Sequence, residues 1–169
     1  SLSMINELKL EASELIVKMS SEGHYSPEVM DQVYSLGERL SSTIFSSFLS
    51  NELKIKVIYF DIRKVLHTDS SFTRAIPNIE KIKLSTSEHL VPLIEDDKII
   101  VTQGFVGCSL DGKTTTLGRE GSDYSATLLG EALNASQVNI WTDVPGIATA
   151  DPKKMKSAKF VKEMNFEEA

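Results

Sequence analysis

The chain has 169 residues, 41% of them hydrophobic, and a formal net charge of −6. This composition is that of an ordinary soluble globular protein with room for one core. The negative charge argues against a nucleic acid or an acidic membrane surface as the main partner. No apolar run reaches bilayer length, and the N-terminus lacks a signal-peptide pattern. A single cysteine, Cys108, excludes an internal disulfide and predicts a cytoplasmic protein.

The first 50 residues predict two amphipathic helices. Apolar residues at spacings of three and four indicate a helix from about Ser3 to Ser20. Ser26 is a good N-cap and Pro27 suits the first helical position, so a second helix is expected from there to about Leu49. Its expected apolar face consists of Val29, Val33, Leu36, Leu40, Ile44 and Phe48. Glu38 is expected to project away from the centre of that face.

The remainder predicts strands that alternate with helices. The expected strands are 56–60, which ends at Asp61, 98–105, and 137–142, which ends at Asp143, with a further short strand at 159–161. The expected helices are 79–93 and 122–134. This alternation predicts an α/β fold with a mainly parallel sheet. Ligands of such sheets bind where the strands end, here at Asp61, at the loop 104–121 and at Asp143.

The chain ends on a pattern that starts helices. Asn165 is followed three residues later by Glu168, which resembles a capping box with Asn as the cap. A helix is therefore expected to begin where the sequence stops, which predicts a piece of a longer protein.

The stretch GCSLDGKT, residues 107–114, fits the pattern of a phosphate-binding P-loop. A P-loop places its Gly-Lys-Thr at the start of a helix, so that the backbone N–H groups face the phosphates. Lys113 is instead followed by three β-branched threonines and then by two glycines, which disfavour a helix. The context therefore argues against a P-loop, although Asp143 could imitate the acidic magnesium ligand of that class.

A better anion site follows a few residues later. Gly118 and Gly121 flank Arg119, and Ser122 is expected to cap the next helix, with Asp123 in its first turn. Glycines permit close backbone approach, the helix N-terminus attracts negative charge, and Arg offers a planar fork for a carboxylate or phosphate. A capped helix after a flexible loop with a solvated arginine fits the pattern equally well, so both interpretations stay open at this point.

Two long strings then identify a resemblance. VTQGFVGCSLDGKTTTLGREGSDYSATLLGEALNA and VNIWTDVPGIATADP closely resemble the aspartokinases, members of the amino-acid kinase family. SLGERLSS and FDIRKVLHTDSSFTRA resemble matching aspartokinase segments upstream, so the resemblance covers about residues 26–169. It implies a three-layer α/β/α sandwich truncated at both ends. Residues 1–169 would form one partial catalytic domain, with a helical substrate-side part at 1–55 and an α/β part at 56–169.

The family transfers a phosphoryl group from MgATP to the side-chain carboxylate of L-aspartate, giving 4-phospho-L-aspartate for lysine, threonine and methionine synthesis. The resemblance implies that Arg119 binds the carboxylate of the substrate and Glu38 its ammonium group. It implies that Gly121 and Ser122 lie at the substrate and that Asp123 has a catalytic role, orienting lysines beside the transferring phosphate. The implied nucleotide-binding residues are Thr142, Asp143, Asp151 and Lys153. Magnesium should arrive with ATP and not in a protein cage.

Several family features are missing. The N-terminal Lys-Phe-Gly-Gly-Thr motif, the later Gly-Ala-Lys motif and the regulatory region are absent, Ala148 stands where an aromatic residue is common, and Lys153 replaces an arginine. We therefore expect the chain by itself to be inactive and, with an exposed sheet edge, able to self-associate as a homo-oligomer. A non-catalytic α/β module that binds a nucleotide or a partner protein is the alternative.

Overall fold

The computed structural model describes residues 2–23, 25–94, 97–142 and 145–165. The chain forms two compact units, Ser1–Val138 and Asn139–Ala169. Each unit is described by itself below.

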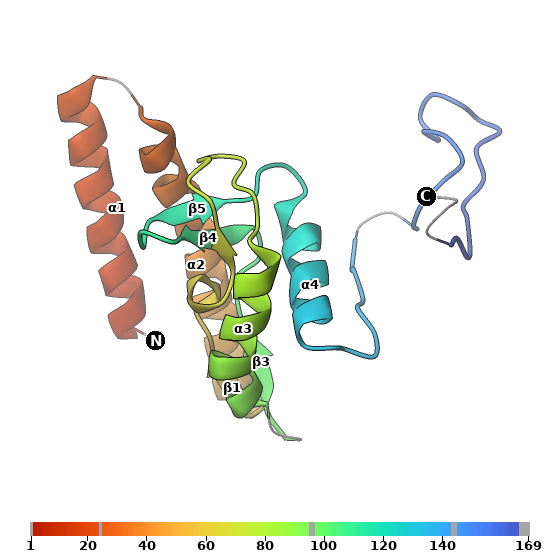
Figure 1. The fold of residues 1–169 in the computed structure, drawn as a ribbon, viewed down its shortest axis with the longest axis horizontal. Coiled ribbons are helices and arrows are strands. Elements are labelled where there is room, and N and C mark those ends of the chain that lie inside the picture. The colour runs from red at the N-terminus through yellow and green to blue at the C-terminus, as the bar shows by residue number, and fades with distance from the viewer. Residues whose placement is uncertain (1, 24, 95–96, 143–144, 166–169) are drawn as a thin grey trace. The chain divides into compact units, whose positions relative to one another are not determined.

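Two long helices begin the first unit. Helices α1 (Leu2–Glu22) and α2 (Pro27–Asn51) pack side by side (Figure 1). The Ser26 side chain accepts a hydrogen bond from the Val29 N–H at 3.3 Å, and Pro27 is the first helical residue. The predicted boundaries, cap and proline position are therefore confirmed.

The face that α2 buries differs from the prediction. Its buried residues are Val29, Asp31, Ser35, Ser42, Thr43, Ser46 and Leu49. The predicted core residues Leu40, Ile44 and Phe48 are 37%, 51% and 49% exposed, so the predicted apolar face is wrong for this part of the helix. Serine and threonine hydroxyls can be buried here because they bond to carbonyls of their own helix, as Thr43 does to Arg39 at 2.7 Å. These small side chains let the helix backbone approach the strands.

The strands form two short sheets. In one, β1 (Val57–Tyr59) pairs in parallel with β3 (Ile99–Val101). In the other, β4 (Val106–Ser109) pairs in parallel with β2 (His67–Thr68) and antiparallel with β5 (Thr114–Thr116). The predicted α/β class with mainly parallel pairing is confirmed. The predicted strand 98–105 is too long, because it ends at Val101 and Phe105 has a left-handed backbone with φ +67°.

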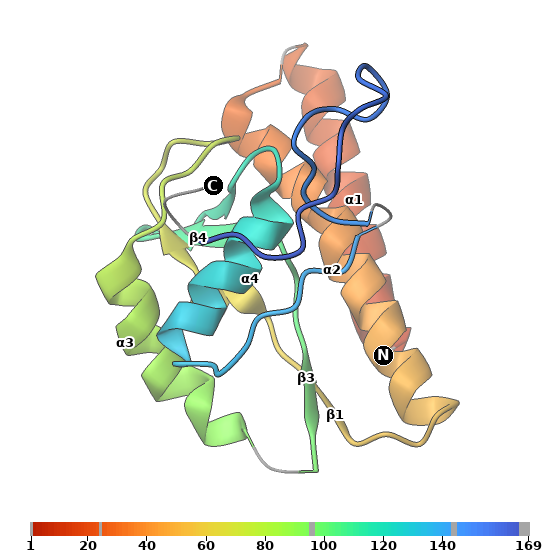
Figure 2. The ribbon, with the colours of Figure 1, turned by 90° about the vertical axis from the view of Figure 1, so that its right-hand side faces the viewer.

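Helices α3 (Ile79–His89) and α4 (Gly121–Ala132) pack together on the opposite side of the strands from α2 (Figure 2). Two short 3-10 helices, η1 (Ile62–Lys64) and η2 (Val91–Leu93), complete this unit. The core lies between the strands and the α3–α4 layer. It contains Phe60, Ile62, Val65, Leu66, Ile82, Leu90, Val106 and Leu128. Residues 1–138 therefore show the expected order of helix, sheet and helix layers.

The P-loop-like stretch is a β-hairpin. Gly107, Cys108 and Ser109 belong to β4, and Thr114 opens β5. Gly112 makes the turn with φ +83°, a conformation that glycine adopts without strain. The Lys113 ammonium lies 2.8 Å from a carboxylate oxygen of Glu28 on α2. No helix follows this turn, so the argument against a phosphate-binding loop is confirmed.

Replacing Lys113 with alanine tests this conclusion. We expect Lys113→Ala to leave ATP affinity unchanged, because the side chain pairs with Glu28 at the hairpin tip and faces no phosphate-binding backbone. Isothermal titration with MgATP measures this. A large loss of ATP affinity would restore the P-loop interpretation, with Lys98→Ala as the control for loss of one lysine charge.

The second unit contains little regular structure. Residues 147–149 and 159–161 run antiparallel around the isolated bridge between Ala148 and Phe160, so the predicted short strand 159–161 is reduced to one bridge with two flanking hydrogen bonds. The predicted strand 137–142 is wrong: these residues form no strand, and Trp141 is 93% exposed. A strand is stable only in a ladder with a neighbour. Asp143 lies outside the described residues. The helix start predicted at Asn165–Glu168 lies outside them after Asn165. No helix among the described residues is long and apolar enough to span a membrane.

Candidate functional site

A pocket in the first unit brings Glu38 and Arg119 together. Its volume is about 410 Å³. Its lining residues are Tyr34, Gly37, Glu38, Thr73, Phe105, Thr116, Gly118 and Arg119. Glu38 comes from α2, and Arg119 comes from the loop between β5 and α4. The fold therefore places one acidic and one basic side chain, far apart in sequence, on the wall of the same pocket.

Glycine and left-handed backbone shape the loop that carries Arg119. Gly118 has φ +81° and Glu120 has φ +60°. A Cβ on Gly118 would lie 3.1 Å from the Thr73 carbonyl oxygen, so the loop passes close to the turn at 71–74. The Arg119 side chain is 94% exposed, and its Nε lies 3.6 Å from a Glu120 carboxylate oxygen. An exposed ion pair of this kind is weak, which leaves the guanidinium available to a ligand.

The start of α4 differs from the prediction. The helix begins at Gly121, and Glu120 occupies the N-cap position without a side-chain cap bond. Ser122 is therefore not the cap. Its hydroxyl instead lies against Gly104, where an added Cβ would come within 2.9 Å of Ser122 Oγ. The glycines at 118 and 121 and the left-handed Glu120 set the start of this helix, and that local geometry outweighs the capping preference of serine.

The other residues predicted around Arg119 occupy distinct places. Gly121 is buried, and a Cβ there would meet the Phe105 ring at 2.9 Å. Ser122 lines a separate groove of about 390 Å³ beside α4 that also includes Gly104. Asp123 is exposed in the first turn of α4, where the positive end of the helix dipole favours a carboxylate. The pocket with Glu38 thus includes Arg119 but not the side chain of Ser122.

The lining residues Tyr34, Gly37, Thr73, Phe105 and Thr116 were not predicted from the sequence. Thr73 and Phe105 both have left-handed backbones, with φ +69° and +67°, which are strained for residues with a β-carbon. The Phe105 N–H donates to Ser125 Oγ at 3.1 Å, and the Thr73 N–H donates to Asp31 Oδ2 at 2.8 Å. The glycine before Phe105 was the only sequence signal of a tight turn there. Thr73 lies within the aspartokinase-like segment FDIRKVLHTDSSFTRA, but no local pattern there indicated that it lines the pocket.

The second unit has a pocket of its own, with a volume of about 570 Å³. Its lining residues are Pro145, Gly146, Ala148, Ala150, Asp151, Pro152, Lys153 and Phe160. Asp151 Oδ1 accepts the Lys153 N–H at 2.9 Å and so stabilises the turn that carries Lys153. Two of the four predicted nucleotide-binding residues thus share one mostly apolar pocket. Thr142 lies in a segment without regular structure before it, and Asp143 falls outside the described residues.

Residues 3–169 match the model of the Amino acid kinase family. The chain belongs to this family. It is 45% identical over 144 residues to Lysine-sensitive aspartokinase 3 of Escherichia coli K12, which is 85% of this chain and 32% of that protein. It is 35% identical over 171 residues to the aspartokinase of Chlamydia trachomatis, which is 98% of this chain and 39% of that protein.

Solved aspartokinase structures have the same fold. The crystal structure of E. coli aspartokinase III in complex with aspartate and ADP matches with a TM-score of 0.84 and 40% identity, over 94% of this chain and 35% of that one. The complex of the same enzyme with lysine and aspartate matches with a TM-score of 0.81 and 39% identity, over 96% of this chain and 36% of that one. The chain therefore spans about a third of the length of the relatives it matches.

Of the strand ends predicted to bind ligands in this member of the amino acid kinase family, Asp61 is already occupied by a partner within the protein. Asp61 follows β1, but both of its carboxylate oxygens bond to Arg63, at 2.6 to 3.1 Å. Arg63 also donates to Thr114 Oγ1 at 3.0 Å. Burial alone would raise the pKa of Asp61, but the hydrogen bonds and the positive charge of Arg63 outweigh it, so the pKa lies below its usual value. Asp61 is therefore a structural partner of Arg63.

This pair predicts a pH-dependent contribution to stability. A carboxyl group with a lowered folded-state pKa stabilises the protein above its unfolded-state pKa, and that stabilisation is lost as the pH falls through the folded-state pKa. We expect Asp61→Asn to lower the melting temperature more at about pH 7 than at about pH 3. Calorimetry at both pH values checks this. An equal decrease at both would show that the charge of Asp61 contributes nothing, and Asp97→Asn at an exposed position is the control.

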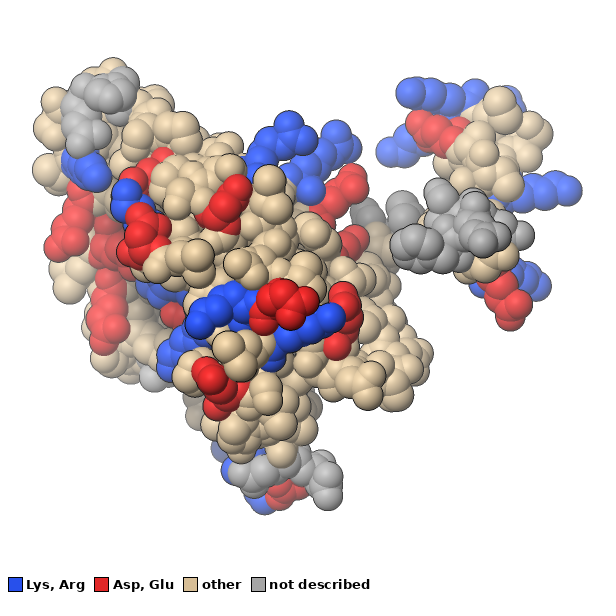
Figure 3. Space-filling model, viewed as in Figure 1, with Lys and Arg blue, Asp and Glu red and all other residues tan. Residues whose placement is uncertain are grey.

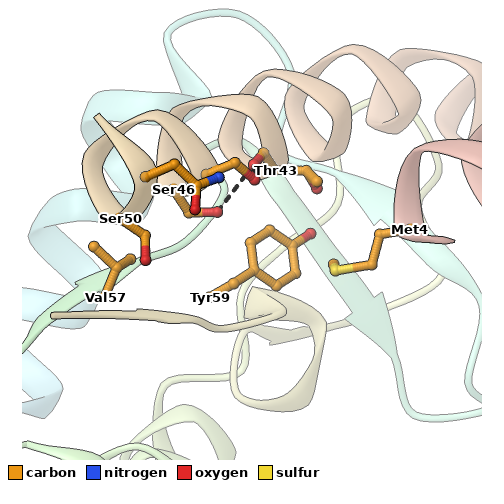
Figure 4. Close-up of a pocket in the computed structure, with 8 residues that line it drawn as sticks. Met4, Thr43, Ser46, Ser50, Val57 and Tyr59 are labelled. Atoms are coloured by element: carbon orange, nitrogen blue, oxygen red, sulfur yellow. Dashed lines mark hydrogen bonds between the residues drawn. The ribbon is translucent and has the colours of Figure 1, made fainter. Parts of the chain in front are cut away.

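A further cavity, of about 260 Å³, is formed by residues of α1, α2 and β1 (Figure 4). Its lining residues are Met4, Thr43, Ser46, Ser47, Ser50, Asn51, Val57 and Tyr59. None of them is charged, and the Ser46 hydroxyl already bonds to the Thr43 carbonyl at 3.0 Å. On the face that Figure 3 shows, the described acidic and basic side chains are intermixed without a broad patch of one sign. The pocket of Glu38 and Arg119 remains the best candidate for a charged ligand.

Proposed function

We propose that this chain carries the amino-acid acceptor site of an aspartate kinase, and that the site is the pocket lined by Glu38 and Arg119. The main support is that these two oppositely charged residues line one pocket. A free amino acid presents an ammonium group and a carboxylate at a fixed spacing, and a carboxylate and a guanidinium are their natural partners. The similarity to an aspartokinase solved with aspartate and ADP supports L-aspartate as the ligand.

The proposed roles of the individual residues are those that the resemblance to the aspartokinases implies. Arg119 binds a substrate carboxylate, and Glu38 binds the ammonium group. Gly121 lets the backbone at the start of α4 approach the substrate, and Ser122 is a further substrate-binding residue in the first turn of that helix. Asp123 serves the transferring phosphate by orienting basic groups supplied from outside residues 1–169. The exposed position of Asp123 in the first turn of α4 supports this, because basic groups from outside the helix can reach its carboxylate.

The nucleotide is proposed to bind in the second unit. Asp151 and Lys153 line a pocket whose apolar walls, including Phe160, suit the flat base of ATP. Thr142 and Asp143 are proposed to complete it. Mg²⁺ is expected to come with the phosphates, because it keeps most of its waters and binds few protein ligands. The whole chain then forms part of one kinase domain, helical and substrate-side at 1–55 and α/β at 56–169, and acts in the cytoplasm in amino-acid biosynthesis.

The chemistry asks little of the protein besides position and charge. One side-chain carboxylate oxygen of aspartate attacks the γ-phosphorus of ATP, the bond from that phosphorus to the bridging oxygen breaks, and ADP leaves. The attacking carboxylate is already ionised at neutral pH, so no general base is required. Phosphoryl transfer has a loose transition state that is stabilised by positioning and by positive charge. A pocket that fixes the acceptor by two charged groups supplies the positioning.

Ligand selectivity tests this function. We expect titration calorimetry to show binding of L-aspartate to the chain and weaker binding of succinate, which keeps both carboxylates but lacks the ammonium partner of Glu38. Glu38→Gln should weaken L-aspartate and leave succinate unchanged. Equal binding of the two ligands would exclude this role for Glu38, and binding of MgATP with no amino-acid binding would favour the non-catalytic nucleotide-binding module.

Activity is tested in a hybrid enzyme. The matching segment of E. coli lysine-sensitive aspartokinase 3 is replaced by this chain, and ADP formation that depends on L-aspartate is measured. We expect activity in the hybrid and none in the same hybrid with Arg119→Ala. The isolated chain is expected to be inactive, and size-exclusion chromatography with light scattering tests its expected self-association.

A further inference from the structure

A buried carboxylate lies beneath the pocket of Glu38 and Arg119. Asp31 is on α2, two helical turns before Glu38, and its side chain is fully buried. It accepts three hydrogen bonds: from the Thr73 N–H at 2.8 Å, from the Thr116 N–H at 3.0 Å and from the Thr116 hydroxyl at 2.5 Å. All three donors are neutral. A buried carboxylate is costly unless its oxygens are hydrogen-bonded. Because breaking these bonds would leave the charge unsatisfied, they hold α2, the turn at Thr73 and the end of β5 together.

The two partners of Asp31 line the pocket, and Asp31 does not. Thr73 belongs to the turn 71–74, and Thr116 ends β5, three residues before Arg119. The Thr116 carbonyl in turn accepts the Ala75 N–H at 2.9 Å. The carbonyl oxygen of Thr73 is also the nearest of the atoms that a Cβ on Gly118 would meet. Asp31 therefore joins the helix that carries Glu38 to the strand and loop that carry Arg119.

Thr73 needs such a partner because its backbone is strained. Its φ of +69° is unfavourable for a β-branched residue. The N–H that points to Asp31 fixes this peptide, and the same turn is closed from the other side by Asp69. The Asp69 carboxylate accepts hydrogen bonds from the Ser71 N–H, the Ser71 hydroxyl and the Ile76 N–H. Asp69 thus closes the turn locally, whereas Asp31, among the residues that the structure describes, is the one that bonds this turn to α2.

We infer that Asp31 is a positioning residue that sets the spacing between Glu38 and Arg119, acting through Thr73 and Thr116. This rests on the proposed function, in which those two side chains hold the two charged ends of L-aspartate. A displacement of one charged group by about 1 Å can reduce binding or turnover up to about a hundredfold. A change at Asp31 therefore affects the affinity for the amino acid although Asp31 does not touch it.

The test compares Asp31→Asn with Asp69→Asn in the whole chain. Both substitutions replace one carboxylate that bonds to the turn 69–76, but only the first cuts the link to α2. We expect Asp31→Asn to raise the Kd for L-aspartate about tenfold or more and Asp69→Asn to change it less than about twofold. In an Arg119→Lys background, Asp31→Asn should have a clearly smaller effect, because the two act on the same contact. Equal effects of the two asparagine variants, or none, would overturn the inference.

Two further measurements apply if Asp31→Asn fails to fold or if the parent chain binds no L-aspartate. If Asp31→Asn fails to fold, it is combined with Thr73→Gly, since glycine accepts the left-handed backbone without Asp31. The double variant should recover the fold but not the affinity for L-aspartate, because the link to α2 is still cut; full recovery of affinity contradicts the inference. Hydrogen exchange of the Thr73 and Thr116 amides should be slow in the parent and fast in Asp31→Asn. If the parent binds no L-aspartate but the exchange result holds, the proposed function fails and the tie made by Asp31 stands; unchanged exchange overturns it.

Discussion

Replacing Arg119 with alanine is expected to raise the Kd for L-aspartate about a hundredfold. A hydrogen bond to a charged group contributes about 1.5–3 kcal/mol, and each 1.4 kcal/mol corresponds to a factor of ten in affinity. Arg119 is exposed, lines the pocket and has only a long contact to Glu120 as an ion pair. Its guanidinium therefore does not have to leave a strong partner before it binds the ligand. Isothermal titration of the chain with L-aspartate measures the change.

Two variants give this prediction its controls. Arg119→Lys keeps the charge and loses the planar fork, so its Kd should lie between those of the parent and Arg119→Ala. Lys83→Ala removes the same charge on the opposite helix layer, where Lys83 pairs with Glu131 at 2.8 Å, and should leave the Kd unchanged. If Lys83→Ala weakened L-aspartate as much as Arg119→Ala, net charge and not a specific contact would explain the loss.

Replacing Gln103 with leucine is expected to lower the free energy of unfolding by about 2–4 kcal/mol, because it leaves several buried polar groups without partners. The Gln103 side chain is buried between α2 and the strands. It accepts the Ile62 N–H at 3.0 Å and donates to Ser42 Oγ and Tyr59 Oη, both at 2.9 Å. Leucine has a similar volume but none of these groups. Denaturant unfolding followed by circular dichroism measures the change.

Tyr59→Phe separates the polar contribution from packing. It removes one of the three partners and keeps the ring, so we expect a loss of about 0.5–1.5 kcal/mol. If Gln103→Leu lowered the free energy of unfolding no more than Tyr59→Phe, the hydrogen bonds of the Gln103 amide would not be what links α2 to β1 and η1.

Gln103→Leu is also expected to weaken L-aspartate binding, because Gln103 lies two residues before Phe105, which lines the pocket.

The sequence predicted those features of the fold that depend on residues close together in the chain, such as where α2 begins. Ser26 and Pro27 mark the start of α2 because capping depends on neighbouring residues alone, and three consecutive threonines marked β5 as unsuited to a helix. The start of α4 was displaced from Ser122 because two glycines and a left-handed Glu120 fix the preceding loop. Capping preference is a weaker effect than that backbone geometry.

Features that depend on distant contacts were not predictable in the same way. On α2 the apolar and the serine-threonine residues both recur at helical spacing, and only the packed structure shows that the small residues face the strands. The segment 137–142 has the residues of a strand but no strand in the described structure. Thr73 enters the pocket through its bond to Asp31, 42 residues away in sequence. The candidate roles of Glu38 and Arg119 came from family resemblance, and their shared pocket came from the fold.

Mapping L-aspartate onto the chain by NMR tests the central claim most directly. The chain is labelled with ¹⁵N and titrated, and the backbone amide shifts are followed residue by residue. The largest shifts are expected at Gly37, Glu38 and Gly118–Gly121, with none at the hairpin tip 110–113. Shifts confined to other residues, or no shifts at saturating L-aspartate, would contradict the assignment of this pocket as the acceptor site.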